Sequence, residues 1–201
     1  DNNIVVGTCT RSTDFPLLNP IQPNLSSGLE GCVFKLDRHL SNIIWSTYFG
    51  GSGDDCIYSV DFNRNNDIVF GGGTTSPDLN TTPLAFQQSY NSSNAFSPDG
   101  FITTIGNNAD SIFFSTYFGT DSYDQVFFID VTKNDQVHVL GQTNDTNNFF
   151  IKNSTISTQK SGQFISTLSS SLSSVIRSST VGSGKGTPDI SPTAFMVDLC
   201  N

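Results

Sequence analysis

Hydrophobic and polar positions along the chain repeat at a spacing much longer than one strand or one helix. Residues 43–53 read IIWSTYFGGSG, residues 112–122 read IFFSTYFGTDS, and a shorter version at residues 175–182 reads VIRSSTVG. Ser115 lies 69 positions after Ser46, and Ser178 lies 63 positions after Ser115. The pattern predicts a repeat protein in which the 201 residues hold roughly three units.

Within one unit, the pattern predicts two hairpins separated by a long loop. Residues 56–63 alternate with the period of a half-buried strand, which places three apolar side chains on one face: Tyr58, Val60 and Phe62. A turn rich in Asn and Asp joins this segment to the apolar residues 68–70, so the two segments are expected to pair. The second predicted hairpin comprises residues 100–105 and 112–118, and its last strand is apolar enough to be buried on both faces.

The repeat also predicts the organisation of the whole chain as one β-repeat domain. Residues 1–10 match residues 65–74, so the first unit, residues 1–49, is expected to lack its first strand. Residues 50–119 and 120–181 form two complete units. Residues 182–201 form a truncated last unit, in which the segment 194–199 resembles a third strand.

The predicted fold class is all-β, because no segment has helical periodicity over three turns. Four-stranded antiparallel units that follow one another along the chain are typical of propeller blades, and sheets repeated side by side leave few exposed edges. The expected architecture is therefore propeller-like, either a partial propeller or an open array of about three blades.

Charge and hydropathy exclude several classes of partner. Asp and Glu number 18 against 9 Lys and Arg, so the formal net charge is −9 and the sequence pI is near 4.3. An acidic surface without a Lys/Arg cluster repels nucleic acid and anionic membranes. The sequence has no apolar run of 18 residues and no signal peptide, so we expect no membrane insertion, and the chain to be a mature secreted product or a piece of a longer one.

Four cysteines raise the question of disulfides. Their spacing does not suggest zinc, which leaves either four buried thiols or two disulfides formed in an oxidising compartment. Cys9 ends the second predicted strand of its unit and Cys32 begins the third, so we expect these two to be bonded. Cys56 and Cys200 would then pair by elimination. Two disulfides favour an extracellular or cell-surface location.

Five N-x-S/T sequons support the same location. All five fall in the predicted long loops, residues 15–29, 75–99 and 144–162, which each join strand two to strand three and should emerge on one rim. The possible glycosylation sites are Asn24, Asn80, Asn91, Asn144 and Asn153.

Residues that could carry chemistry are few. His39 lies in a turn and His138 in a buried-looking strand, neither near a nucleophile motif, so we expect no enzyme activity and no organic cofactor. Four side chains with oxygen atoms alternate in one hairpin turn as they do in calcium loops: Asp61, Asn63, Asn65 and Asp67. This run lacks the glycine and the later Glu of such loops, so an ordinary Asx-rich turn is the alternative to a weak calcium site.

The segment IIWSTYFGGSGDDCIYSVDFNRNNDIVFGGGTTSPDL, together with STDFP at residues 12–16, resembles the SBBP (beta-propeller) repeat family. The family pattern runs roughly YSTYLGGSGDD followed by VDxxGNxYVTGxTxSxDFP. This resemblance implies a propeller-like module of the kind found in large secreted and cell-surface proteins, usually without known catalytic residues.

Two function classes follow. The first is a non-catalytic structural or adhesive module of an extracellular assembly, with other subunits or copies of itself joined through terminal strands as partners. The second is a carbohydrate-binding module that uses exposed aromatic residues of the long loops: Phe86, Tyr90 and Phe96. The competing explanation for the incomplete end units is that further units complete the ring in a longer chain.

Overall fold

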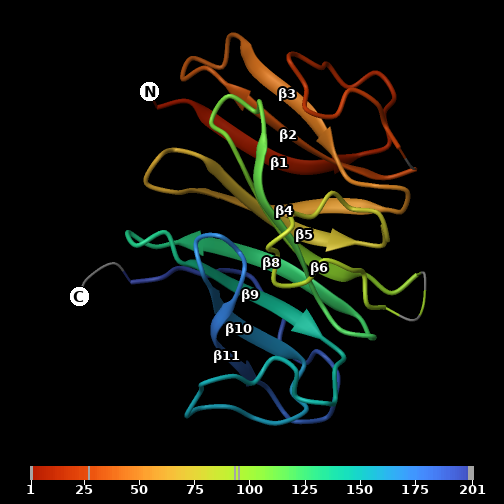
Figure 1. Ribbon diagram of the computed structural model, residues 1–201, viewed down its shortest axis with the longest axis vertical. Helices are drawn as coiled ribbons and strands as arrows, with labels where there is room; N and C mark the ends of the chain where they lie inside the picture. Colours follow the sequence, from red (N-terminus) through yellow and green to blue (C-terminus); the bar gives the residue numbers. More distant parts are fainter. Residues whose placement is uncertain (1, 27, 93, 95, 199–201) are drawn as a thin grey trace.

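The protein consists of three antiparallel β-sheets placed one after another (Figure 1). The computed structural model describes residues 2–26, 28–92, 94 and 96–198. Within these residues the chain forms eleven strands and no helix, so the all-β prediction is confirmed. The sheets do not close into a ring.

Every sheet is built from strands that follow one another in the sequence. The first sheet has the order β1-β2-β3, and the other two have four strands each, β4-β5-β6-β7 and β8-β9-β10-β11. The strands are β1 (Ile4–Thr10), β2 (Glu30–Leu36), β3 (Ile43–Phe49), β4 (Asp55–Phe62), β5 (Ile68–Thr74), β6 (Asp99–Ile105), β7 (Ile112–Phe118), β8 (Asp124–Val131), β9 (Val137–Thr143), β10 (Gln163–Leu168) and β11 (Val175–Val181).

The short hairpin turns repeat in the same conformation. The turns between β2 and β3, β6 and β7, and β10 and β11 each contain one residue with positive φ at the equivalent position, namely Leu40, Ala109 and Leu172. The turns after β4 and β8 use Asn66 and Asp135 in the same way. Asn and Asp tolerate this left-handed conformation better than most residues, so the Asx-rich sequence of those two turns suits their geometry.

The long loops cover the outer edge strand of each sheet. They leave on the right-hand side of Figure 1, where β1, β5 and β9 end, and then run back along β3, β7 and β11. Backbone hydrogen bonds join Ser46 N to Leu18 O at 2.9 Å and Thr82 N to Ser115 O at 3.0 Å, and Ser178 and Lys152 exchange two. Unpaired edge strands invite aggregation, and here the loop of the same unit covers each one.

The repeated STYF sequence supplies the side chains that hold these loops. Ser46 Oγ donates to Pro16 O at 2.6 Å, and Ser178 Oγ donates to Phe150 O at 2.6 Å in the third unit. The hydroxyl of Tyr117 accepts from Leu79 N at 2.8 Å and donates to Ser76 O at 2.7 Å. These contacts give a physical reason for the recurrence of the Ser and Tyr positions along the chain.

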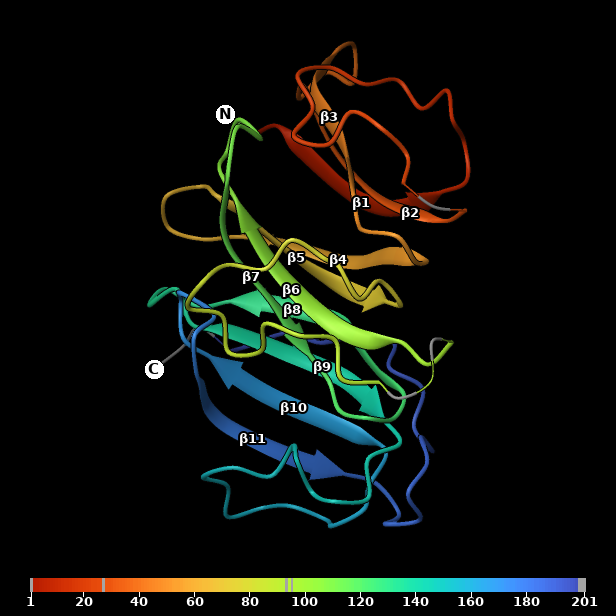
Figure 2. The same ribbon diagram turned by 45° about the vertical axis from the view of Figure 1, so that its right-hand side comes forward.

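The hydrophobic core lies between neighbouring sheets, which are stacked along the long axis of the molecule (Figure 2). Phe49 ends β3 and packs against Phe70 and Phe101 of the middle sheet, with ring centroids 4.9 and 5.5 Å apart. Phe118 is its equivalent in β7 and packs against Phe150 and Phe164, at 5.3 and 5.6 Å. Each fully buried phenylalanine stabilises the fold by roughly 1.5–3 kcal/mol, so the sheets hold one another together.

One predicted strand face is wrong. In β4, Ile57 is 2% exposed, whereas Tyr58 and Phe62 are 39% and 38% exposed. The pairing register of β4 with β5 shifts between Ile57 and Ser59, as at a β-bulge. An extra residue at that point places Ile57 on the same side as Val60, which packs against the core, whereas Tyr58 stacks on Phe127 of β8. The simple alternation in the sequence does not reveal this bulge.

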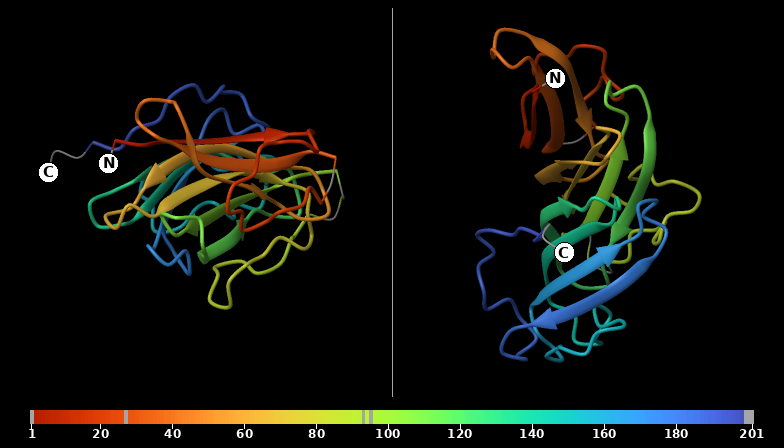
Figure 3. Two further views of the ribbon diagram at one scale, coloured as in Figure 1. Left: turned by 90° about the horizontal axis from the view of Figure 1, so that it is seen from above. Right: turned by 90° about the vertical axis from the view of Figure 1, so that its left-hand side faces the viewer.

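The predicted third strand at residues 194–199 is also wrong within the described residues. Residues 182–198 contain no strand, and residues 189–197 lie along the third sheet, as the dark blue segment in Figure 3 shows. Val197 N donates to Asp130 Oδ2 at 3.0 Å, as Val131 N of β8 donates to Asp61 Oδ2 of β4 at 2.6 Å. The segment therefore takes the position that β4 and β8 hold as the first strands of their sheets. Too few residues separate it from β11 to form the hairpin that would have to come before a third strand.

The predicted Cys9–Cys32 disulfide is wrong, because Cys9 is bonded to Cys56. Cys9 faces Gly31 across the β1–β2 pair and Cys32 faces Thr8, so the two cysteine side chains point to opposite faces of the first sheet. Cys9 points toward β4 of the middle sheet, where Cys56 lies. This pairing also rules out the Cys56–Cys200 bond, and Cys200 lies outside the described residues.

The Cys9–Cys56 disulfide links the first sheet covalently to the middle sheet, and we expect it to stabilise the fold. It joins residues 47 positions apart, and the chain-entropy relation gives a stabilisation of about 4 kcal/mol for that loop length. Replacing both cysteines by serine should lower the free energy of unfolding by a comparable amount, measured by urea denaturation.

Peptide mapping under non-reducing conditions provides the direct check. Cys32 is a buried free thiol whose pKa is raised by burial to about 11, so it should react with iodoacetamide only after unfolding. Recovery of a Cys9–Cys32 peptide would contradict the observed pairing.

Candidate functional site at the sheet junctions

Buried acidic side chains meet where one sheet follows another. The last strand of each sheet ends in a short turn that leads into the first strand of the next, at residues 50–54 and 119–123. The first residue of that strand is an aspartate in both cases, and its backbone N–H reaches back to the preceding sheet. Asp55 N donates to Leu29 O at 2.9 Å, and Asp124 N donates to Pro98 O at 2.8 Å.

At the first junction Asp55 lies beside Glu30, and both side chains are buried. Asp55 Oδ2 accepts from Gly51 N at 2.8 Å and from Ser76 Oγ at 2.7 Å. A methyl group added to Gly50 would collide with the Asp55 carboxylate and lie 2.7 Å from Glu30 Oε1. The two carboxyl groups thus share the space that the missing side chain of Gly50 leaves.

The second junction repeats this arrangement with Asp99 and Asp124. Both side chains have no exposed surface. Asp99 Oδ2 accepts from Gln87 Nε2 at 3.2 Å and from Asn91 N at 2.9 Å. Asp124 Oδ2 accepts from both the backbone N–H and the hydroxyl of Thr120, at 2.6 Å each.

In each of these aspartates the second carboxylate oxygen, Oδ1, is buried. Asp99 Oδ1 is buried and makes no hydrogen bond within the described structure. Asp55 Oδ1 and Asp124 Oδ1 are buried without a hydrogen bond of good geometry, although the hydroxyls of Thr74 and Thr143 interact with these two carboxyl groups and oppose the rise in their pKa. Buried polar atoms without a partner are uncommon and costly in native proteins. Asp55 and Asp124 occupy the same position of the repeat, and Asp99 occupies that of Glu30.

Burial raises the pKa of all three aspartates. The pKa of Asp99 is raised to about 7 by burial, with a smaller contribution in the same direction from Asp124. Burial raises the pKa of Asp55 to about 6, and the neighbouring Glu30 adds to it. The pKa of Asp124 is likewise raised by burial to about 6, against the hydrogen bonds from Thr120.

Each junction has a surface pocket next to it on the side of the long loops. The pocket at the second junction has a volume of about 290 Å³ and is lined by Asn91, Gly119, Thr120, Asp121 and Asp145, among others. The pocket at the first junction has about 430 Å³, and its lining includes Ser52, Asp54, Thr75 and Phe96. None of the four buried carboxyl groups is among the residues that line these pockets.

The same position after the third sheet is held by a different pair. Gln163 begins β10, where Glu30 begins β2 and Asp99 begins β6. Asp189 takes the place of Asp55 and Asp124, and its Oδ2 accepts from Ser183 N at 2.8 Å. An amide has replaced one carboxyl group here, and Gln163 Oε1 is again buried without a partner in the described structure.

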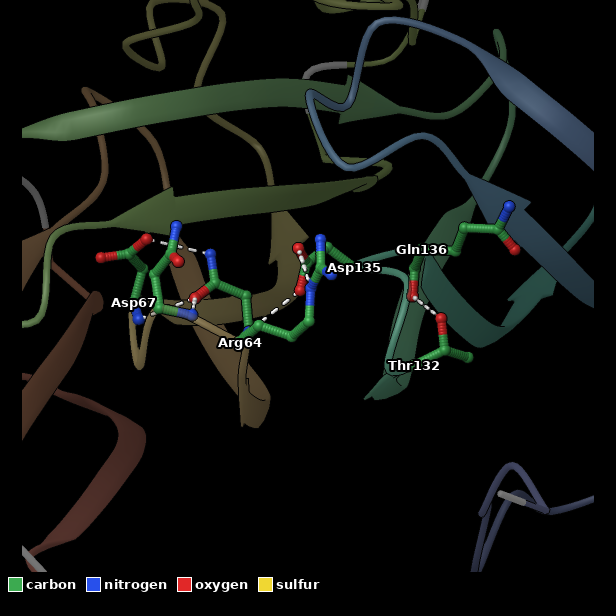
Figure 4. A network of polar contacts seen from close by, with 7 residues as sticks. Arg64, Asp67, Thr132, Asp135 and Gln136 are labelled. Atoms are coloured by element: carbon green, nitrogen blue, oxygen red, sulfur yellow. Dashed lines mark hydrogen bonds and ion pairs between the residues drawn. The ribbon is translucent and has the colours of Figure 1, made fainter. Parts of the chain in front are cut away.

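The predicted calcium turn does not gather its four side chains around one point. Asp61 accepts from Val131 N of the next sheet, whereas Asn63 bonds within the turn to Asp67 and Asn65. Arg64 of this turn reaches the equivalent turn of the third sheet, where its Nε lies 2.8 Å from Asp135 Oδ2 (Figure 4). The side chains of the turn thus take part in turn geometry and in sheet–sheet contacts.

The histidines lie away from the junctions. His39 is exposed in the turn before β3 and accepts from Arg38 Nε at 3.0 Å. His138 of β9 is half-buried, lies 3.0 Å from Thr167 Oγ1 and has a pKa lowered by burial.

The aromatic residues of the long loops differ in exposure. Phe86 and Tyr90 are half-buried and pack against the core clusters, whereas Phe96 is 90% exposed. Phe96 lines the pocket at the first junction.

All five sequon asparagines are exposed on the long loops. Two of them use the side-chain nitrogen that a glycan would occupy. Asn91 Nδ2 donates to Gly119 O at 3.5 Å, and Asn153 Nδ2 donates to Ile176 O at 3.0 Å.

The acidic junctions were missed at the sequence level, although a signal exists. Asp124 lies 69 positions after Asp55, and Asp99 lies 69 positions after Glu30, which is the offset of the repeat itself. Only 13% of the residues are charged, so a charge that recurs at the repeat spacing is informative. Their burial could not be foreseen, because it depends on how the next sheet docks.

Comparisons with known proteins add no family. No family model matches the chain, and no curated protein gives a significant match. The described part of the chain has no helix with the length and apolarity needed to cross a bilayer.

The raised pKa values predict that the protein loses stability as pH rises. A carboxyl group whose pKa is higher in the folded state stabilises fully below its unfolded pKa of 3.8, and this contribution is lost through the folded values of about 6 and 7. The free energy of unfolding should fall between about pH 4 and pH 7, by roughly 2–3 kcal/mol for each aspartate. Urea titrations at several pH values measure it.

The matched variant is Asp99→Gln, which reproduces the side chain that the chain itself uses at position 163. In this variant the free energy of unfolding should change less with pH than it does in the unaltered chain. A pH profile identical to that of the unaltered chain would show that Asp99 does not titrate in this range.

Proposed function

We infer that the chain is a non-catalytic structural or adhesive module of an extracellular assembly, built as a propeller-like series of sheets. The observation that supports this most is the segment 189–197, which contacts the third sheet as β4 and β8 contact the sheets before them. The same junction is thus used for each successive sheet. Such a series forms a scaffold that extends by adding further copies of one unit.

An extracellular location is consistent with the covalent features of the chain. The Cys9–Cys56 disulfide fits an oxidising compartment. The exposed sequons place any glycans on the long loops, and Asn24, Asn80 and Asn144 present side chains that are better suited to modification than those of Asn91 and Asn153. Binding to partners would then involve the surfaces away from these loops.

The partners we propose are further sheets of the same kind, in other subunits or in copies of this chain. β1 is an outer strand of the first sheet and pairs only with β2 among the described residues. Residues 189–197 lie in a first-strand position and pair with no strand in the described structure. Both offer backbone groups to an added strand.

A carbohydrate-binding module is the second candidate, and one observation favours it. Phe96 is 90% exposed beside a pocket whose lining includes Ser52 and Asp54. An exposed aromatic ring next to hydroxyl and carboxylate groups can stack on a sugar and bond to its hydroxyls.

Light scattering coupled to size-exclusion chromatography tests the proposed assembly. The chain should associate beyond its monomer mass of 21.7 kDa as its concentration rises. Thr8→Lys adds a charge to the exposed side chain of an edge strand and should weaken this association without unfolding the protein. A folded monomer at every concentration contradicts assembly through these strands.

A glycan array separates the two candidates. Saturable binding to one class of sugar, lost in Phe96→Ala, would favour the carbohydrate-binding function. The structural function predicts no sugar-specific binding.

A further inference from the structure

We propose that residues 189–197 of one chain pair with β1 of a second copy and supply the first strand that the first sheet lacks. This inference rests on the proposed function, and it names the partner and the pairing register. The middle and third sheets begin with β4 and β8, which pair with β5 and β9. The first sheet has three strands, and β1 holds in it the position of β5 and β9.

The end of β1 has the same local structure as the end of β5. Thr10 faces the first residue of β2, as Thr74 faces the first residue of β6. Thr10 Oγ1 accepts from Ser12 N at 3.0 Å, and Thr74 Oγ1 accepts from Ser76 N at 2.9 Å. Thr10 and Ser12 are therefore the equivalents of Thr74 and Ser76.

These equivalent residues differ in what covers them. Thr74 and Ser76 have no exposed surface and lie against Asp55, the first residue of β4. Ser76 Oγ donates to Asp55 Oδ2 at 2.7 Å, and the hydroxyl of Thr74 interacts with the same carboxyl group. In the first sheet Thr10 is half-buried, and Ser12 is exposed and bonds to a neighbouring side chain of its own loop. The first sheet thus presents two hydroxyl groups at the place where the aspartate of a first strand belongs.

Residues 189–197 carry the other half of this junction. Asp189 Oδ2 accepts from a backbone N–H of the preceding turn, as the Oδ2 atoms of Asp55 and Asp124 do. Asp55 and Asp124 are 1% and 0% exposed, whereas Asp189 is exposed. The segment is docked on the third sheet through Val197 N, and no strand pairs with it in the described structure.

The proline of this segment suits a first strand. The pairing registers of β4 and β8 shift at Tyr58 and Phe127, each of which lies three residues after the aspartate that begins its strand. Pro192 lies three residues after Asp189. Proline has no N–H to donate and is tolerated at bulges. The segment is one residue longer than β4, so its bulge holds one more residue.

A second copy is the partner that brings the two halves together. The first and third sheets lie at opposite ends of the long axis (Figure 2), so one chain cannot join them. The contact is heterologous, because the end of one copy meets the beginning of the next. With three sheets in each copy, a ring of two copies has six, which lies within the range of about four to eight blades in closed propellers.

The repeat also gives the register of this pairing. Val131 N donates to the third-last residue position that Val197 N uses one sheet later, so Val197 is the equivalent of Val131. Val131 faces Val137, the first residue of β9, and Ile4 is the first residue of β1. Val197 of one copy should therefore face Ile4 of the next.

Cysteine cross-linking tests this register. A Val197→Cys chain and an Ile4→Cys chain, both also carrying Cys200→Ser, are mixed and oxidised. A disulfide should join one chain of each kind, seen as a product of twice the chain mass whose linked peptides contain positions 4 and 197. Thr8→Cys is the matched control for Ile4→Cys, because Thr8 lies on the same face of β1 about 13 Å away. The mixture with Thr8→Cys should lose the cross-link.

A second pair of positions keeps the test decisive if the first pair disturbs folding. Val6 and Phe195 lie two residues further along and should also face each other, so Val6→Cys mixed with Phe195→Cys should cross-link as well. A disulfide formed by Ile4→Cys alone would show that β1 pairs with β1 of another copy, and would overturn the proposal. Association in light scattering without a cross-link at either pair would overturn this register and leave the proposed function standing. A folded monomer at every concentration would overturn both.

Discussion

The structure depends on how each sheet satisfies the backbone of its last strand. β3, β7 and β11 would each expose a row of unpaired N–H and C=O groups if the long loops pointed into solvent. The loop of the same unit instead runs along that strand and bonds to it, at Leu18, Gln22, Thr82, Gln87 and Lys152. The loop also brings residues such as Phe150 and Leu79 into the core. The last strand of each sheet is therefore hydrogen-bonded by the loop of its own unit and needs no strand from another unit there.

The remaining surfaces of the unit are its faces, and these are buried by stacking. Because Phe49 and Phe118 end their last strands, the following turn must approach the start of the next sheet closely, and a glycine is found there in both units. The acidic pairs lie at this close approach. The apolar contacts between sheets and the burial of these carboxyl groups thus follow from one arrangement. At neutral pH the apolar contacts stabilise the fold, whereas unpaired buried carboxylates destabilise it.

Much of the local structure could be predicted from the sequence, because it is set by short-range pattern. The strand at residues 112–118 was predicted with the bounds observed. The features that could not be predicted depend on contacts between units: the bulge in β4, the pairing of Cys9 with Cys56, and the docking of residues 189–197. The burial of Asp99 and Asp124 belongs to this second group, since nothing near them in sequence marks them as internal.

Hydrogen–deuterium exchange at single amides tests the account of the unit most directly. Tyr48 N, Tyr117 N and Ser178 N lie on edge strands. They donate to the loop carbonyls of Gln22, Gln87 and Lys152, at 3.3, 3.0 and 2.8 Å. The account predicts that all three amides exchange slowly, together with the strands inside the sheets. Exchange of these three amides at the rate of unstructured peptide, with the inner strands still protected, would contradict it.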